Sequence, residues 1–386
     1  MDRTSLRRPL ARTTAVIAVA CAAVAALAGA AGRASPDGAR GPAAPVLYVA
    51  NTSSRPGTVT PISTATNTAG KPIRAGGTPS AMVVTPDGRT IYVGNYSPGT
   101  VTPISAVTNT AGRPIKIGSI PYVMAITPNG RTVYVANRGP AEVTPIQVTT
   151  DTAGPPIKVG GRSARIDALA VTPDSRTLYA VDYHSGTVTP ISTATNRAGK
   201  PIKVGPEPAE IAITPDGRTA YVSNSGSDTV TPIRVATNTA GKPITVGPEP
   251  GAVAITPDGR TAYVADYGSG AVTPVRVATD TAGRPVKTGA DPYLIAITPN
   301  GRTAYVLSYH TGAVTPVRVA TNTAGRPVRV GKRPIAIAIT PDGKTGYVAN
   351  IGNFGRGTVT PFSTATNTAG KPITVGAGPT ALVIAR

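Results

Sequence analysis

The chain has 386 residues and a formal net charge of +20, with 38 Lys and Arg residues against 18 Asp and Glu. Its single cysteine, Cys21, excludes an intrachain disulfide framework, and only His184 and His310 are available for imidazole chemistry. Trp is absent and aromatic residues make up 4% of the chain, so a core has to be built from Val, Ile and Ala with a few Tyr.

Residues 1–31 have the features of a secretory signal peptide. Four arginines precede an apolar run over residues 15–31, and small residues end it. An uncleaved membrane anchor is the alternative, because the run approaches the length that spans a bilayer. Residues 32–45 are rich in Pro, Gly and Ala and are expected to form a flexible segment. The signal predicts an extracellular or cell-envelope protein, with one domain over residues 46–386.

A repeat fills that domain. An Ala-Gly pair recurs at spacings of 42 or 45 residues, with its glycine at Gly70, Gly112, Gly154, Gly199, Gly241, Gly283, Gly325 and Gly370. The unit over residues 207–248 contains four short apolar stretches (AIAIT, TAYV, TVTPI and KPITV) separated by turn residues, and no helical periodicity. Four antiparallel strands in a unit of about 42 residues predict the blade of a β-propeller, an all-β fold.

The residue types give the order of the four strands, called a to d. Strand a carries small residues, which suit the crowded centre, at Ala125, Ala170, Ala212, Ala254, Ala296 and Ala338. Strand d carries Pro with Lys or Arg, which protect an exposed edge from pairing. Strand b holds eight repeated tyrosines, the chain opens on strands b, c and d, and it closes on a lone strand a at residues 380–385. Eight blades, closed by pairing of the two ends, are predicted; seven blades with a loose terminal repeat are the alternative.

The proline of strand c conflicts with continuous hydrogen bonding between the strands of a blade. Strand c carries a proline in every unit, and a proline cannot donate a hydrogen bond to a neighbouring strand. We therefore predict a break in strand pairing at each of these residues: Pro61, Pro103, Pro145, Pro190, Pro232, Pro274, Pro316 and Pro361.

The units resemble the YVTN-type β-propeller repeats of bacterial and archaeal surface proteins. The likeness lies in the TPDGRT turn, the ATNT turn and strand b, as in Tyr48-Val49-Ala50-Asn51 and Tyr347-Val348-Ala349-Asn350. The proline of strand c departs from the family pattern, as do Asp182, Asp266 and Ser308 in place of the Asn. The resemblance implies a surface propeller with a binding or structural role and no single catalytic residue set.

The loops of the two faces differ in how strictly they repeat. The a–b and c–d turns are nearly constant, whereas the b–c and d–a loops vary and contain both three-residue insertions, near 161–166 and within 350–358. Variable loops on one face are typical of a binding face, although loops without a structural duty also drift. The candidate site residues on this face are Asp182, His184, Glu207, Glu210, Asp228, Asp266, Asp291, Tyr183, Tyr267 and Tyr309, with Glu249, Tyr96 and Tyr293 beside them.

These residue types suit two kinds of ligand. A ring of carboxylates can hold calcium, and carboxylates with Tyr rings can bind a cationic or sugar ligand. The alternative is that these are solvated loop residues, and the sequence predicts no cofactor beyond the calcium option.

The cations repeat at the a–b turns and along strand d. They suit an anionic polymer of the cell envelope, and the alternative is edge protection and solubility, repeated because the blade was duplicated. Their spread around a rim argues against a specific nucleic-acid groove.

Three functions remain open from the sequence. The first is a secreted or cell-surface binding or scaffold module, expected to be a monomer, whose partner is a cell-envelope polymer or another surface protein. The second is a propeller enzyme such as a lactonase-like hydrolase, which the sequence favours less because no nucleophile–base pair stands out. The third is an amplified domain without a specific ligand.

Overall fold

The computed structural model describes residues 44–53, 56–118, 120–139, 141–161, 164–352 and 355–385. The predicted signal peptide and nearly all of the segment that follows it lie outside this range. Within the described residues, no helix is long and apolar enough to cross a membrane.

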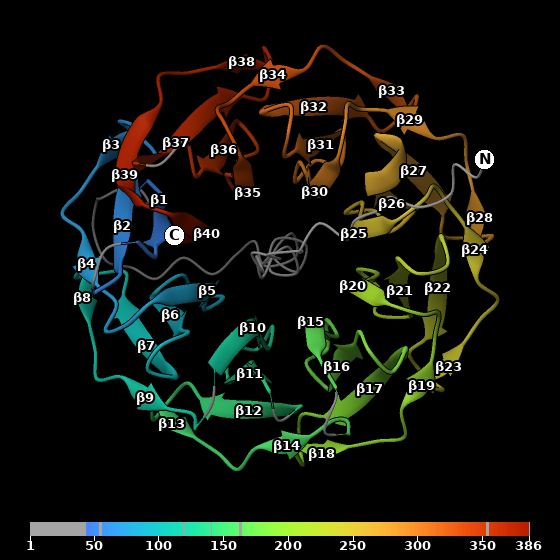
Figure 1. Ribbon diagram of the computed structural model, residues 1–386, viewed down its shortest axis with the longest axis horizontal. Coiled ribbons are helices and arrows are strands. Elements are labelled where there is room, and N and C mark those ends of the chain that lie inside the picture. Colours follow the sequence, from blue (N-terminus) through green and yellow to red (C-terminus); the bar gives the residue numbers. More distant parts are fainter. Residues whose placement is uncertain are drawn as a thin grey trace, which may run out of the picture.

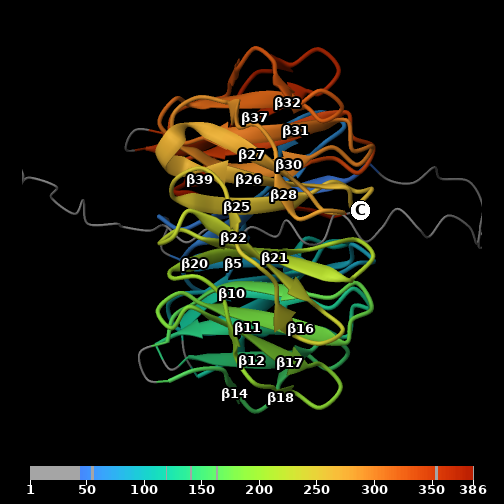
Figure 2. The same ribbon diagram turned by 90° about the vertical axis from the view of Figure 1, so that its right-hand side faces the viewer.

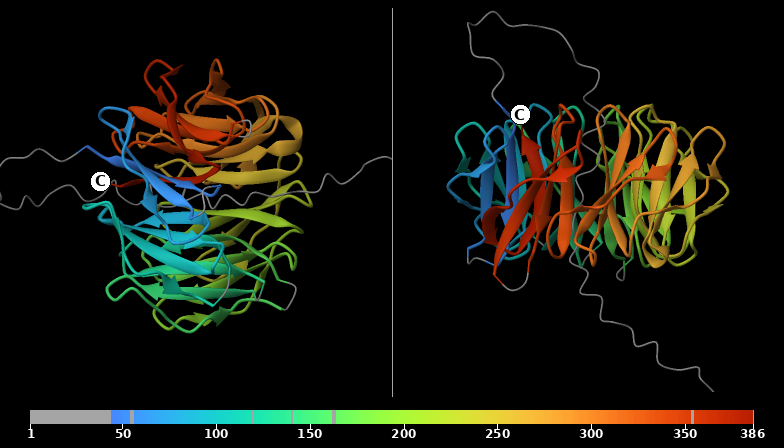
Figure 3. Two further views of the ribbon diagram at one scale, coloured as in Figure 1. Left: turned by 60° about the vertical axis from the view of Figure 1, so that its left-hand side comes forward. Right: turned by 90° about the horizontal axis from the view of Figure 1, so that it is seen from above.

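The described chain forms eight antiparallel sheets around one axis, which confirms the eight-bladed propeller (Figure 1). Seen edge-on, the ring is a disc whose blades run from one face to the other (Figures 2 and 3). The inner strands, in order of blades 1 to 8, are β40 (Pro379–Ala385), β5 (Pro79–Val84), β10 (Ile120–Ile126), β15 (Ile166–Val171), β20 (Pro208–Ile213), β25 (Pro250–Ile255), β30 (Pro292–Ile297) and β35 (Pro334–Ile339).

In each blade, the second and third strands pair with each other without interruption. The second strands are β1 (Val46–Asn51), β6 (Thr90–Asn95), β11 (Thr132–Arg138), β16 (Thr177–Asp182), β21 (Thr219–Asn224), β26 (Thr261–Asp266), β31 (Thr303–Ser308) and β36 (Thr345–Asn350). The third strands are β2 (Thr58–Ser63), β7 (Thr100–Ser105), β12 (Glu142–Gln147), β17 (Thr187–Ser192), β22 (Thr229–Arg234), β27 (Ala271–Arg276), β32 (Ala313–Arg318) and β37 (Arg356–Ser363).

The fourth strand is split in every blade, a difference from the single KPITV strand expected above. Its two pieces are β3 (Thr68–Ala69) and β4 (Ile73–Arg74), β8 (Thr110–Ala111) and β9 (Ile115–Lys116), β13 (Thr152–Ala153) and β14 (Ile157–Lys158), β18 (Arg197–Ala198) and β19 (Ile202–Lys203), β23 (Thr239–Ala240) and β24 (Ile244–Thr245), β28 (Thr281–Ala282) and β29 (Val286–Lys287), β33 (Thr323–Ala324) and β34 (Val328–Arg329), and β38 (Thr368–Ala369) and β39 (Ile373–Ala377).

The proline of the third strand causes this split, so the predicted break in pairing is confirmed. In blade 1, β2 pairs with β1 without interruption, but it pairs with the outer pieces only at Ile62–Ser63 and at Thr58–Val59. The carbonyl oxygen of Pro61 faces outward and accepts a hydrogen bond from the amide of Gly70 at 2.8 Å. The missing N–H of the proline faces the same way, because the N–H and C=O of one residue point to the same side of an antiparallel strand.

This contact also explains the Ala-Gly pair of the repeat. A Cβ atom on Gly70 would stand 3.2 Å from Cγ of Pro61, so a larger residue would press on the proline. The turn itself is made three residues earlier, where Asn67 adopts a φ of 54°. The asparagine of the ATNT turn, and not Gly70, therefore supplies the left-handed turn residue.

Strand pairing closes the ring as predicted. β40, from the C-terminal end, pairs with β1, from the start of the domain, from Val46 opposite Ala385 to Asn51 opposite Pro379. Blade 1 is thus assembled from both ends of the domain, and β1 is paired on both sides, with β2 and with β40.

Each blade is joined to the next by a buried tyrosine of its second strand. The hydroxyl of Tyr134 donates to Oδ1 of Asn196 in the c–d turn of the following blade at 2.7 Å. The same bond recurs in all eight blades, between Tyr48 and Asn109, Tyr92 and Asp151, Tyr179 and Asn238, Tyr221 and Asp280, Tyr263 and Asn322, Tyr305 and Asn367, and Tyr347 and Asn67. The last of these crosses the junction of the two ends.

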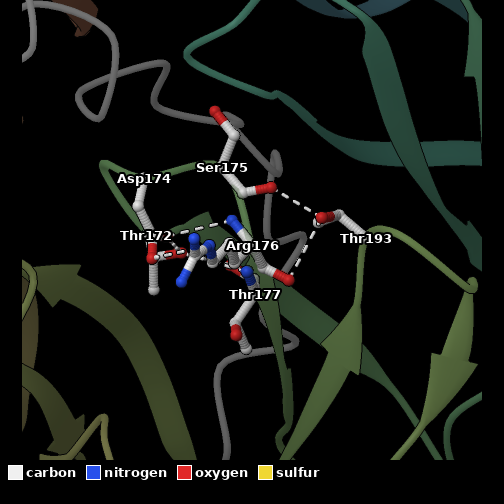
Figure 4. Close-up of polar contacts among 6 residues, drawn as sticks. All are labelled: Thr172, Asp174, Ser175, Arg176, Thr177 and Thr193. Carbon is white, nitrogen blue, oxygen red and sulfur yellow. Dashed lines mark hydrogen bonds and ion pairs between the residues drawn. The ribbon is translucent and has the colours of Figure 1, made fainter.

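The a–b turns repeat a second hydrogen-bonded unit, shown for blade 4 in Figure 4. The hydroxyl of Thr172 donates to Oδ1 of Asp174 at 2.6 Å, and that oxygen also accepts the amide of Arg176 at 3.0 Å. Thr193, which follows strand c, donates its hydroxyl to the carbonyl of Ser175 at 2.6 Å. This bond places the a–b and c–d turns on the same face, as the sequence predicts.

The core lies between neighbouring blades and is made of Val, Ile, Ala and the repeated Tyr. Blade 8 alters this template at one pair of facing residues, Gly346 and Phe362, which oppose each other across strands β36 and β37. Blade 5 has Ala220 opposite Ile233 at the same place. A Cβ atom on Gly346 would collide with the ring of Phe362, so the glycine accommodates the phenylalanine.

We predict that these two residues are energetically coupled. Gly346→Ala alone should destabilise the protein by about 1–3 kcal/mol, because it overpacks a buried ring. Phe362→Ile alone should also destabilise it, because the ring leaves a void and its contact with Tyr305 is lost. The double variant, which restores the pair found in blade 5, should recover about 1–3 kcal/mol of the summed loss in urea unfolding. Strictly additive losses would contradict the pairing.

Candidate functional site

The b–c and d–a loops share the second face of the disc, here called the variable face. Hydrogen bonds between the two kinds of loop place them together, such as the amide of Tyr183 to the carbonyl of Arg165 at 2.9 Å and the amide of Ser225 to the carbonyl of Glu207 at 3.0 Å. The two three-residue insertions also fall in loops of this face, partly outside the described residues. The predicted division into a repeated face and a variable face therefore matches the structure.

Two of the predicted site residues are interior residues of their blades. The side chain of Asp182 is 2% exposed, and its Oδ1 accepts the amides of Arg165 at 2.9 Å and His184 at 3.1 Å. Asp266 is fully buried and its Oδ2 accepts the hydroxyl of Thr273 at 2.6 Å. Both occupy the position of the YVTN asparagine, where Asn224 donates to Thr231, so they hold loops and strands together and do not face the surface.

Burial of Asp266 has an electrostatic cost. Desolvation raises the pKa of its carboxyl to about 6, although the hydroxyl of Thr273 and the amide of Gly247 lower it and Asp228 adds a further rise. The fold thus disfavours the charged form of Asp266. An asparagine at this position avoids the cost because it carries no charge.

Every inner strand starts with a β-bulge close to the variable face. Three blades place a large polar or aromatic residue at the bulged position: Tyr122 in β10, Asp167 in β15 and Tyr293 in β30. Other blades have a small or aliphatic residue there, such as Ser80, Ala209 or Ile335. Bulges re-aim side chains and are frequent next to binding sites.

These residues form an axial cluster with Glu210, the residue after the bulge in β20. Burial raises the pKa of Tyr293, and its interactions with Tyr122, Tyr309, Glu210 and Tyr267 raise it further. Tyr122 and Tyr293 belong to blades 3 and 7, which stand opposite each other in the ring (Figure 1), so this interaction crosses the axis. Glu210 accepts the amide of Ile211 at 3.2 Å.

Both carboxyl groups of the axial cluster are hard to ionise. Desolvation raises the pKa of Glu210 to about 7, with a further rise from Asp167. Desolvation also raises the pKa of Asp167 to about 6, although Arg165 and His184 lower it. Arg165 binds Asp167 with a 2.7 Å bond and stacks over the ring of Tyr183 at 4.7 Å. Cation, carboxylate and aromatic ring are therefore held together at one side of the axis.

A surface depression of about 330 Å³ adjoins this group between blades 4 and 5. Three of the predicted residues, Tyr183, His184 and Glu207, line it together with Lys203, Val204 and Pro206. Tyr183 links the depression to Arg165 and the axial cluster. This volume lies at the lower end of the range of small-molecule sites.

The remaining predicted residues are dispersed over blades 5 to 7. Asp291 contacts Nδ1 of His310 at 2.6 Å, and Arg333 donates to the hydroxyl of Tyr309 at 2.9 Å. Asp228 accepts the amide of Glu249 at 2.9 Å. Tyr267 begins the short 3₁₀ helix η3 (Tyr267–Ser269). The structure does not bring His310 to His184, which lies three blades away.

Sequence reasoning missed Arg165, Asp167, Tyr122 and Lys203. A signal for Asp167 and Tyr122 was present, because most repeats carry a small or aliphatic residue at this position of strand a. Arg165 gave no such signal, since other repeats carry Glu207, Glu249, Asp291 or Arg333 at its position. Among the described residues, no group of three or more His, Cys, Asp or Glu side chains is placed to hold a metal ion.

Comparison with known proteins supports the fold but establishes no activity. A family model described as "Lactonase, 7-bladed beta-propeller" matches residues 175–283, which is under a third of the chain. No curated protein matches the sequence.

Several solved structures are similar in fold at low sequence identity. Hydrazine synthase of Kuenenia stuttgartiensis is 20% identical, with a TM-score of 0.59, over 77% of this chain and 95% of that one. The dihydro-heme d1 dehydrogenase NirN, solved in complex with DHE, is 14% identical, with a TM-score of 0.76, over 89% of this chain and 76% of that one. A functionally unknown protein of Desulfotomaculum acetoxidans is 17% identical, with a TM-score of 0.61, over 77% and 99%. At these identities the likeness establishes a β-propeller and no activity.

We predict that Asp266→Asn stabilises the protein at neutral pH. The pKa of Asp266 is raised from an unfolded value near 3.9 to about 6, so the folded state loses stability as pH rises from about 4 to 6, by about 1–3 kcal/mol in total. Asparagine removes this loss. The variant should therefore melt higher than wild type at pH 7.5 and at nearly the same temperature at pH 4.

Asp258→Asn in the same blade is the matched control. Desolvation raises the pKa of Asp258, but hydrogen bonds from Thr256 and from the amide of Arg260, with the charge of Arg260, outweigh it and the net shift is downward. Its ionised form is favoured in the fold, so this variant should bring no gain at pH 7.5. Equal gains from both variants would contradict a specific cost at Asp266.

Proposed function

We propose that the protein is a secreted or cell-surface binding propeller whose ligand occupies the depression between blades 4 and 5. The observation that carries this proposal is the convergence of Tyr183, His184 and Glu207, from two different blades, on one depression of the variable face. Lys203 contributes a cation to the same lining.

The chemistry of the lining favours a polar, hydroxyl-rich ligand such as a sugar unit of a cell-envelope polysaccharide. Tyr183 offers a ring, while His184, Glu207 and Lys203 offer hydrogen-bonding groups of both kinds. Arg165 and Asp167 stand behind Tyr183 and hold its ring by stacking and by their own ion pair. A ring held in this way binds a rigid ligand at a lower cost in side-chain entropy.

The test is binding of the purified protein to an array of neutral and acidic oligosaccharides. We expect His184→Ala combined with Glu207→Gln to weaken the strongest interaction about tenfold or more, because two polar contacts are lost. His310→Ala, in the matching YHTG loop of blade 7, is the control and should change affinity less than threefold. Equal losses in both variants, or no array member that depends on the depression, would refute the proposal.

A propeller enzyme is the second candidate function. Two observations favour it, the partial match to a lactonase family model and the raised pKa values of Glu210 and Asp167, which would suit acid–base chemistry near neutral pH. Lactones are the substrate class to test.

We predict no turnover of a panel of lactones by the purified protein, with or without added calcium. The described residues place no activated nucleophile beside Glu210 or Asp167, so hydrolysis would have to rely on one of these carboxyl groups as a base. Release of acid from a lactone is followed by pH-stat titration. Turnover that Glu210→Gln abolishes, while Asp258→Asn leaves it intact, would replace the binding proposal with the enzyme.

A further inference from the structure

Positive charge is strongly segregated on this molecule. The outer strand pieces and the residues that join them carry fourteen Lys and Arg side chains, all exposed: Lys71, Arg74, Arg113, Lys116, Lys158, Arg197, Lys200, Lys203, Lys242, Arg284, Lys287, Arg326, Arg329 and Lys371. We call this set the basic belt. These described segments contain no carboxylate; Asp151 and Asp280 stand in the turns directly before two of them, and each accepts a hydroxyl from a buried Tyr.

The opposite balance holds on the variable face. Its described loops and strand ends carry nine carboxylates, including Asp167, Glu207 and Glu210, against five Arg and Lys. The a–b turns are nearly balanced, since most of their cations lie next to an Asp, as in the pair of Arg176 and Asp174. Almost all of the net positive charge of the described chain is therefore on the belt.

The belt is continuous around the circumference. The second outer piece of each blade contacts the first outer piece of the next, from β4 against β8 to β34 against β38, and β39 against β3 closes the circle. Figure 1 shows these pieces as an unbroken outermost ring. A cation recurs in every blade, so a flexible chain lying along the edge of the disc meets a new positive charge at each step.

From this geometry we propose that the basic belt binds a linear polyanion, a chain with closely spaced phosphate, sulfate or carboxylate groups, which lies along the circumference. Each contact of an exposed cation with one anionic group is weak, and a chain that engages many blades gains affinity through high effective concentration. The proposal concerns the edge of the disc and does not depend on the depression on the variable face; Lys203 is the one belt residue that also lines that depression.

The expected binding behaviour distinguishes this proposal from a cationic surface that serves solubility alone. Solubility depends on net charge, whereas binding along the belt requires a continuous track of charges. Affinity should therefore rise with the length of the polyanion, and the slope of log affinity against log salt should grow with the number of cations engaged.

The probes are inorganic polyphosphates of increasing length, poly(glycerol phosphate) and polyglucuronate, measured by fluorescence anisotropy on the full chain from 50 to 300 mM salt. We expect long-chain polyphosphate to bind at least tenfold more tightly than tripolyphosphate. Preference for poly(glycerol phosphate) or polyglucuronate identifies the source as a phosphate polymer or an acidic polysaccharide. Length-independent binding, or binding of double-stranded DNA as tight as that of these polymers, would overturn the proposal.

A charge-matched pair of variants locates the interaction. The belt variant changes Lys71, Lys200, Lys242 and Lys371 to Gln; blade 3 has Pro155 at the same position, so the fold accepts an uncharged residue there. The control variant changes Arg89, Arg131, Arg218 and Arg260 of the a–b turns to Gln, with the same loss of charge.

The belt variant should lose at least fivefold in affinity for long polyphosphate at 50 mM salt and show a shallower salt slope, and the control should lose less than twofold. Equal losses in the two variants would show a response to net charge alone and would overturn the belt. Circular dichroism reports whether both variants fold, and the length dependence of the wild type tests the proposal without them.

Discussion

The hydrogen bond from the buried tyrosine of one blade to the c–d turn of the next is the constraint on which this structure depends. Tyr347 reaches Asn67 at 2.7 Å across the junction of the chain ends, with the same geometry that Tyr134 has toward Asn196 inside the chain. A ring closes only if its last unit fits its first as well as every other pair fits. The STATNTAGKPI stretch at residues 63–73 supplies Asn67 to this junction, and its exact copy at 363–373 supplies Asn367 to the junction before it.

The same bond explains why one face of the disc is fixed and the other is free. The asparagine of the c–d turn has to adopt a positive φ and accept the tyrosine hydroxyl, and Asn and Asp are the residues that combine both properties. Three residues later, Gly70 has to fit against Pro61. The b–c and d–a loops are held mainly by backbone bonds, which many sequences satisfy. The sequences of these loops can therefore differ from blade to blade without loss of the fold, which leaves them available for binding residues.

The architecture could be predicted from the sequence because eight units repeat the same pattern of strands and turns. The blade number, the closure by residues 380–385 and the interruption at each strand c proline all follow from positions shared by every unit. The site could be predicted only in part, because it depends on how units differ. Asp182 and Asp266 stand out in the sequence as carboxylates next to a variable loop. Alignment of the repeats places them at the Asn position of strand b, but it does not reveal that this position is buried. Tyr122, Asp167 and Tyr293 owe their placement to β-bulges, which no residue pattern specified.

Repetition also limits what kind of recognition each surface can perform. A feature copied into every blade, such as the cations of the belt, is spread evenly around the circle, so its affinity comes from many equal and weak contacts and discriminates poorly among polyanions. A feature found in one or two blades, such as the group formed by Arg165, Asp167 and Tyr183, breaks the symmetry and can select a single ligand geometry. The two proposed binding surfaces thus differ in selectivity: the repeated cations of the edge favour polyanions in general, and the unrepeated residues of the variable face favour one ligand.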